Sequence, residues 1–225
     1  VLDENITFLN HGSYGACPRA VLKKQNDIRL QMEREPVRFF LREFKDLWDK
    51  ACKSLAEFIN ARPDDIAFVP NATNAINSVL RSIDWEAGDE ILLTNHSYNA
   101  CRNAAYFTAG KFGLRVVVAD IPFPIDSPDT VISSISKAVT PDTKLAIIDH
   151  VTSPTGLIFP IKQIVKLLKK QNIETLVDGA HAPGMLPLDV TDIGASWYAG
   201  NCHKWLCAPK GSAFLHVKHD HQDGL

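Results

Sequence analysis

From residue 66 onward, the sequence alternates between short apolar runs and longer stretches of helical periodicity. The apolar runs, several of them almost continuous in Val, Ile and Leu, cover residues 66–69, 90–93, 114–119, 144–149, 175–177, 196–199 and 212–217. Helical stretches separate most of them, at residues 74–82, 99–111, 129–138 and 161–171. Strands that are apolar on both faces and linked by helices are typical of parallel sheets. The pattern therefore predicts an α/β fold with a mainly parallel, seven-stranded sheet and helices on both faces.

The two ends of the chain depart from this alternation. Residues 1–18 are loop-like, and residues 19–60 have helical periodicity that Pro36 interrupts. The last two apolar runs are joined by about a dozen residues of little helical character, so we expect these two strands to pair antiparallel. We divide the chain into an N-terminal segment, residues 1–18, and one large domain, residues 19–225.

Composition excludes several classes of partner. The 24 basic and 26 acidic residues give a net charge of −2, so bulk electrostatics favours neither nucleic acid nor an anionic membrane. The five cysteines are odd in number and form no C-x-x-C pair, which argues against a disulfide framework or a structural zinc site. No apolar run has transmembrane length. We predict a cytoplasmic protein.

Polar side chains gather directly after five of the predicted strands. In a parallel sheet, the carboxyl ends of the strands and the loops that follow them form the ligand site. The polar clusters are Asn71-Ala72-Thr73, Asn95-His96-Ser97-Tyr98, His150-Val151-Thr152-Ser153, Asp178-Gly179-Ala180-His181 and Asn201-Cys202-His203-Lys204. We therefore expect these five clusters to surround one binding site.

The sequence lacks the usual nucleotide and hydrolase motifs. It has no G-x-G-x-x-G after the first strand, no Walker loop and no G-x-S-x-G elbow. A phosphate can still bind at Asn71-Ala72-Thr73, which precede a predicted helix, because the free N–H groups and the dipole of a helix N-terminus attract anions and Thr73 adds a hydroxyl. The alternative is that Asn71 or Thr73 serves only as an N-cap.

Lys204 lies in a predicted turn between two strands. A buried lysine can lose its proton and attack a carbonyl, although most turn lysines are simply solvated. Asp178 is either a turn residue or a carboxylate for a cationic partner such as a pyridinium nitrogen, and His181 is either structural or a donor to a phenolic oxygen. Tyr98 or His96 either packs or stacks on a ring. Together these residues fit one ligand, pyridoxal 5'-phosphate (PLP).

Two segments carry a resemblance to a known family. They read V-D-G-A-H-A at 177–182 and S-W-Y-A-G-N-C-H-K-W at 196–205, and N-H-G-S stands at 10–13. The chain resembles the class V aminotransferase family over residues 8–217. These are fold-type I PLP enzymes that include cysteine desulfurases. The resemblance is greatest to the isopenicillin N epimerase-like branch, which also holds C–S lyases acting on cysteine conjugates.

The resemblance implies a role for each matching residue. Lys204 would form the Schiff base with PLP and move protons, Asp178 would pair with the pyridinium nitrogen, and His181 would lie near the phenolic oxygen. The residues implied in phosphate binding are Ala72, Thr73, Asn201 and His203. The ring-stacking residue would be Tyr98, with His96 as the alternative.

Other implied contacts lie on the substrate side of the site. Residues 1–18 would form a substrate-side segment that contributes Asn10, His11 and Gly12. Ser153 stands where relatives carry an asparagine, so its contact to cofactor or substrate differs. We predict no metal site, because His216, His219 and His221 lie in a polar tail.

The resemblance also bears on the assembly and the reaction. The family continues through a C-terminal small domain that supplies the arginine for the substrate carboxylate, whereas this sequence ends at Leu225. We therefore expect a cofactor-binding core, either a naturally short form or a fragment, that forms a homodimer. Its expected activity is epimerase-like or C–S lyase (cysteine desulfurase-like) chemistry on an amino acid. The alternative is a truncated, non-catalytic PLP-binding scaffold.

Overall fold

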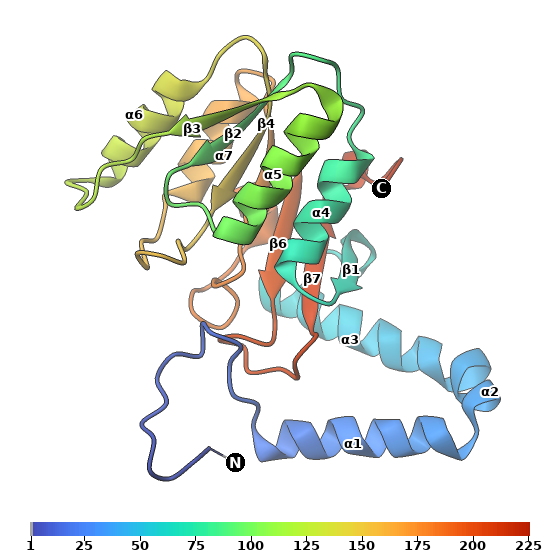
Figure 1. Cartoon of the computed structure of the whole chain (residues 1–225). Helices are drawn as coiled ribbons and strands as arrows, with labels where there is room; N and C mark the ends of the chain where they lie inside the picture. The colour runs from blue at the N-terminus through green and yellow to red at the C-terminus, as the bar shows by residue number, and fades with distance from the viewer. Residues whose placement is uncertain (1) are drawn as a thin grey trace.

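A single mixed sheet forms the centre of the structure, a computed structural model that describes residues 2–225 (Figure 1). Its strands are β1 (Ile66–Val69), β2 (Glu90–Thr94), β3 (Arg115–Ala119), β4 (Thr143–Asp149), β5 (Glu174–Asp178), β6 (Trp197–Asn201) and β7 (Ala213–Val217). The strand order is β1-β7-β6-β5-β4-β2-β3. From β3 to β6, neighbouring strands are parallel, and β7 runs antiparallel to both β6 and β1. The predicted α/β fold and the antiparallel pairing of the last two strands are both confirmed.

Helices cover both faces of the sheet. On one face, α4 (Ala72–Ser82) and α5 (Asn99–Phe112) pack over the strand side chains that point to that face, such as Leu145 and Ile147 of β4. On the other face, α6 (Pro128–Ala138), α7 (Ile161–Lys169) and the short α8 (Val190–Ile193) pack over the alternate residues, such as Ala146 and Ile148. Successive residues of a strand point to opposite faces, which explains the nearly continuous apolar runs.

The N-terminal helices form an arm that extends away from the sheet (Figure 1). The arm consists of α1 (Arg19–Arg34), α2 (Pro36–Arg38), a π-helical turn (Phe39–Glu43) and α3 (Phe44–Ile59). The predicted interruption at Pro36 is confirmed. None of the residues of α1 is buried, and the buried residues of α3 all lie in its second half. A 3₁₀ turn (Pro63–Asp65) leads from α3 into β1, and another (His219–His221) follows β7. None of the helices among residues 2–225 combines the length and apolar character needed to cross a membrane.

Gly179 lies directly after β5, under the ring of Tyr198. A Cβ added at Gly179 would overlap this ring, which is fully buried and whose hydroxyl is 2.8 Å from His150 Nδ1. We predict that Gly179→Ala destabilises the fold by about 1–3 kcal/mol, the usual cost of overpacking a core. Denaturant titration measures the change.

Gly110→Ala is the matched control for this substitution. Gly110 lies in α5 with open space around its Cα, so alanine there is expected to stabilise the helix by up to about 1 kcal/mol. Equal effects of the two substitutions would contradict the packing argument.

Candidate functional site

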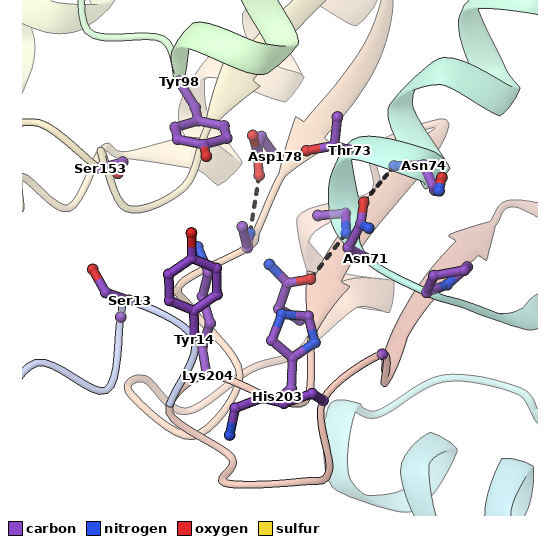
Figure 2. A pocket seen from close by; sticks show the side chains of 17 residues that line it. Ser13, Tyr14, Asn71, Thr73, Asn74, Tyr98, Ser153, Asp178, His203 and Lys204 are labelled. Atoms are coloured by element: carbon purple, nitrogen blue, oxygen red, sulfur yellow. Dashed lines mark hydrogen bonds between the residues drawn. The ribbon is translucent and has the colours of Figure 1, made fainter. Parts of the chain in front are cut away.

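A cavity of about 900 Å³ opens at the carboxyl ends of β5 and β6. It is bounded by the N-terminus of α4, the loop before α5, the loop between β6 and β7, and the N-terminal segment (Figure 2). The lining residues that the argument uses are Gly12, Tyr14, Thr73, Tyr98, Asp178 and Lys204. All five strand-end clusters contribute either to this lining or to the layer directly behind it.

Lys204 reaches the cavity from the loop between β6 and β7, as the sequence predicts. Its Nζ lies 3.1 Å from His181 Nε2 and 5.8 Å from the centre of the Tyr98 ring. Burial lowers the pKa of Lys204, while the carboxylate of Asp178 acts in the opposite direction. The partial desolvation favours the neutral, nucleophilic amine, and the carboxylate of Asp178 opposes it.

Asp178 ends β5 and is held rigidly. Its Oδ1 accepts the N–H of Ala180 at 3.0 Å, and its Oδ2 accepts the thiol of Cys101 at 3.1 Å. Asp149 of β4 is its neighbour across the sheet. Burial and the charge of Asp178 raise the pKa of Asp149 well above its ordinary value. The neutral form of Asp149 is therefore favoured, and Asp178 is the member of the pair that lines the cavity.

The N-terminus of α4 borders the cavity, and part of its hydrogen-bonding capacity is already used. Asn71 caps the helix by accepting the N–H of Asn74 at 2.8 Å, and Asn201 Oδ1 accepts the N–H of Ala72 at 2.9 Å. The N–H and hydroxyl of Thr73 have no hydrogen-bond partner within residues 2–225. Figure 2 shows the Thr73 hydroxyl turned toward the cavity. Asn71 is therefore the N-cap of α4, and Thr73 is not.

His203 lies next to Lys204 in the same loop and lines the cavity. Its Nδ1 is 2.9 Å from the carbonyl oxygen of Ser212, and a carbonyl only accepts, so Nδ1 carries a proton. The other ring nitrogen, Nε2, remains available for a ligand. Burial lowers the pKa of His203, and a bound anion would favour its protonated form.

Tyr98 and His96 occupy different environments. Tyr98 precedes α5, is 41% exposed and lines the cavity. His96 is only 5% exposed, and its two ring nitrogens lie 2.9 Å from the Thr155 hydroxyl and 3.1 Å from the carbonyl oxygen of Ile121. His96 therefore holds the loop, and Tyr98 presents its ring to the ligand space.

The N-terminal segment closes one side of the cavity with Gly12, Ser13 and Tyr14. Asn10 and His11 lie outside the lining: Asn10 bonds to Ser13, and His11 Nδ1 accepts the N–H of Ala16 at 3.2 Å.

Gly15 fixes the position of this segment. It adopts a φ of +63°, and a Cβ there would overlap the carbonyl oxygens of His203 and Lys204. The segment can therefore lie directly on the Lys204 loop only because residue 15 is glycine.

Several cavity residues were not predicted as site residues, among them Tyr14, Asn74 and Lys210. Tyr14 lies at the mouth of the cavity with a left-handed φ of 65°, while Asn74 and Lys210 lie near the α4 terminus and the Lys204 loop. The sequence signal for Lys210 is its place six residues after Lys204, in the same interstrand connection. Ser153, by contrast, lines the cavity as expected.

Residues 2–225 contain no group of three or more His, Cys, Asp or Glu side chains arranged to hold a metal ion.

The chain is similar to curated proteins that catalyse two kinds of reaction. It is 38% identical over 217 residues to isopenicillin N epimerase of Streptomyces clavuligerus, covering 96% of this chain and 54% of that protein. It is 32% identical over 238 residues to the probable chloroplastic L-cysteine desulfhydrase of Arabidopsis thaliana, covering 99% of this chain and 50% of that protein. The chain thus spans about half the length of the curated relatives it matches.

Solved structures of the cystine C–S lyase C-DES have the same fold. The complex with its product cysteine persulfide matches with a TM-score of 0.89 at 26% identity, covering 99% of this chain and 60% of that chain. A C-DES variant with glycine covalently linked to its PLP cofactor matches with a TM-score of 0.85 at 24% identity, covering 99% and 59%. The sequence model of class V aminotransferases matches residues 16–225. The chain therefore belongs to the class V aminotransferase family.

Proposed function

We propose that this chain holds PLP in the cavity beside Lys204 and acts on the α-carbon of an amino acid. The observation that carries the proposal is the position of Lys204 Nζ. It is partly desolvated, faces the ring of Tyr98 and lies in the field of Asp178. When bound, PLP supplies an aldehyde for an amine and a pyridinium ring that withdraws electrons from the substrate.

The cavity fits each part of this cofactor. Asp178 offers a fixed carboxylate to a cationic ring nitrogen, Tyr98 offers a ring face for stacking, and His181 offers a donor beside Lys204. These three groups come from the ends of neighbouring elements, so the fold holds them in position without a ligand. The fit supports the role of each residue that the sequence predicts around the ring.

The phosphate would bind at the N-terminus of α4. Thr73 offers its N–H and hydroxyl, and His203 offers an Nε2–H donor when the bound anion holds the ring doubly protonated. Ala72 and Asn201 contribute differently from expectation, because the Ala72 N–H donates to Asn201 Oδ1. We propose that Asn201 orders the helix terminus and that its amide N–H₂ remains for the phosphate.

Thr73→Val tests this phosphate site. A hydrogen bond to a charged group is worth about 1.5–3 kcal/mol, so we expect PLP affinity to fall by about 10- to 100-fold. Titration of the protein with PLP, followed by absorbance, measures the change. Ser78→Ala is the control, because Ser78 lies on the same helix and its hydroxyl bonds only to the Asn74 carbonyl. An equal loss in both variants would contradict the assignment.

The proposed reaction begins with removal of the α-proton of an amino acid. Lys204 is the group placed to take that proton, since its amine lines the cavity beside His181 and over the Tyr98 ring. Delivery of a proton to the opposite face of the α-carbon yields the epimer, whereas departure of a thiol or hydrogen sulfide from the β-carbon is the reaction of a C–S lyase. The relatives include proteins named for each outcome, so both remain in the proposal.

Hydrogen exchange at the α-carbon tests the shared step. PLP-loaded protein is incubated in D₂O with single amino acids, including cysteine and its conjugates, and NMR follows the α-hydrogen. We expect exchange with at least one amino acid, and pyruvate release then identifies a lyase. Bound PLP without exchange on any amino acid would contradict the proposed enzyme and favour the non-catalytic scaffold.

We further propose that two copies of the chain associate and that residues 1–18 lie on the substrate side. The arm exposes large apolar side chains, with Leu41 79% exposed and Phe40 55% exposed. Such exposed apolar surface favours association. Light scattering during gel filtration measures the mass of the particle and so tests the association.

The cysteines of the described residues are all unpaired, which favours a reducing compartment such as the cytoplasm.

A further inference from the structure

The side chain of His181 is held between two partners. The indole N–H of Trp205 donates to His181 Nδ1 at 3.2 Å, and His181 Nε2 lies 3.1 Å from Lys204 Nζ. An indole nitrogen can only donate, so Nδ1 must be the unprotonated nitrogen of the ring. A neutral imidazole carries one proton, which must then reside on Nε2. The contact with Trp205 therefore determines which nitrogen faces Lys204 as a donor.

This proton has a direct consequence for Lys204. A protonated lysine has three donors and no acceptor, so it cannot form a hydrogen bond with an Nε2–H group. A neutral amine has a lone pair and can accept that bond. The Trp205 contact and a protonated Lys204 thus exclude each other at this distance. The arrangement favours the unprotonated amine, which is the form that attacks a carbonyl.

Neighbouring groups pack closely around the imidazole and its indole partner. A Cβ on Gly12 would lie 3.1 Å from Cε1 and Nδ1 of His181, so the N-terminal segment packs tightly against the ring. Trp205 in turn lies near His11, with the ring centres 6.1 Å apart. Trp205 also follows Lys204 directly in the chain, so one loop positions both partners of His181.

The charges around the pair act in both directions. Asp178 of β5 and the Cys101 thiol of α5 face Lys204 and favour its charged form. Burial opposes them and lowers the pKa of Lys204. Burial and the neighbouring lysine lower the pKa of His181 to about 4, so the imidazole is neutral near pH 7. Because Asp178 favours the ammonium form of Lys204, the contact with His181 Nε2–H adds to burial in favouring the neutral amine.

We propose that Trp205 is a positioning residue that holds the proton of His181 on Nε2 and thereby keeps Lys204 as an unprotonated nucleophile. The proposal deepens the role proposed for Lys204, but it concerns the protein before any cofactor binds. Its test therefore uses cofactor-free protein. If the His181 proton is not on Nε2, the proposal that the cavity holds PLP is unaffected. If the protein does not bind PLP, the assignment of the His181 proton is unaffected.

The first measurement is ¹⁵N NMR of the histidine side chains in the cofactor-free protein near pH 7. The chain has eight histidines, and the signal lost in His181→Gln identifies His181. We expect a protonated Nε2 and an unprotonated Nδ1. The opposite tautomer, or a doubly protonated ring, would overturn the proposal. This measurement needs no substitution at Trp205, so it decides even if variants at that position fold poorly.

The second measurement compares Trp205→Phe with Trp85→Phe. Both remove an indole N–H that donates a hydrogen bond, but Trp85 donates to the Leu80 carbonyl, away from the cavity. Pulse acetylation with acetic anhydride over a pH series, read by mass spectrometry, gives the midpoint at which Lys204 becomes reactive.

In Trp205→Phe, the His181 proton can move to Nδ1, and Nε2 can then accept from a charged lysine. We expect the midpoint to rise by about half to one pH unit, the shift that corresponds to one ordinary hydrogen bond. Trp85→Phe should leave the midpoint unchanged. An unchanged midpoint in Trp205→Phe, or equal shifts in both variants, would overturn the proposal.

Discussion

Replacing Lys204 with alanine is expected to abolish the covalent attachment of PLP and to slow α-hydrogen exchange by at least about 10²–10⁴-fold, the range that a positioned general acid–base group contributes. The cavity keeps Asp178, Tyr98 and Thr73 in place without Lys204, because none of them depends on its side chain for a hydrogen bond. PLP should therefore still bind, but only non-covalently. Equilibrium dialysis measures the binding, and NMR in D₂O measures the exchange.

Lys210→Ala is the control for this substitution. Lys210 lines the same cavity and is also a lysine, but it lies in the part of the loop that leads back to β7. Covalent attachment of PLP should persist after its removal. Covalent attachment that survives in Lys204→Ala and disappears in Lys210→Ala would contradict the assignment of Lys204.

Asp178→Asn is expected to lower the rate of α-hydrogen exchange by about 10²–10³-fold, the usual cost of removing one preorganised electrostatic partner. The substitution keeps the size of the side chain and an oxygen for the Ala180 N–H, so the turn after β5 is preserved. What it removes is the negative charge that would stabilise a cationic ring nitrogen. The measurement is exchange at saturating PLP, so that loss of affinity does not mimic loss of rate.

Asp149→Asn provides a control one strand away. Asp149 is buried beside Asp178, and burial and the charge of Asp178 raise the pKa of Asp149 well above its ordinary value, which favours its neutral form. Its replacement by asparagine therefore resembles that neutral form, and we expect an effect of less than about tenfold, equivalent to 1.4 kcal/mol. If Asp149→Asn lowers the rate as much as Asp178→Asn, the charge does not reside on Asp178 as proposed.

The elements of the sheet could be predicted because their signals are local. Apolar runs, Pro36 and the polar residues that follow each strand are all read within a few positions of the chain, and every predicted strand is present. The position of Lys204 in a turn between two strands follows in the same way. Parallel topology then places the strand ends together, so a cavity that includes Asp178, Thr73 and Tyr98 could be predicted without coordinates.

The contacts that could not be predicted join distant parts of the chain. Asn201 accepts the N–H of Ala72 across 129 positions, and the Trp205 indole reaches His181 across 24. Such pairings depend on how the loops pack once the sheet has formed, and no local pattern encodes them. Similarly, the spacing of Phe40 and Phe44 indicates an apolar stripe but not what covers it. Both side chains are exposed in the structure.

The most direct test of the account is to locate the covalent link between cofactor and protein. The protein is mixed with PLP, reduced with borohydride and digested, and mass spectrometry then identifies the modified residue. The account predicts one modified lysine, Lys204, in the peptide that also contains His203 and Trp205. Modification of a different lysine, or no stable modification after PLP has been added and reduced, would contradict it.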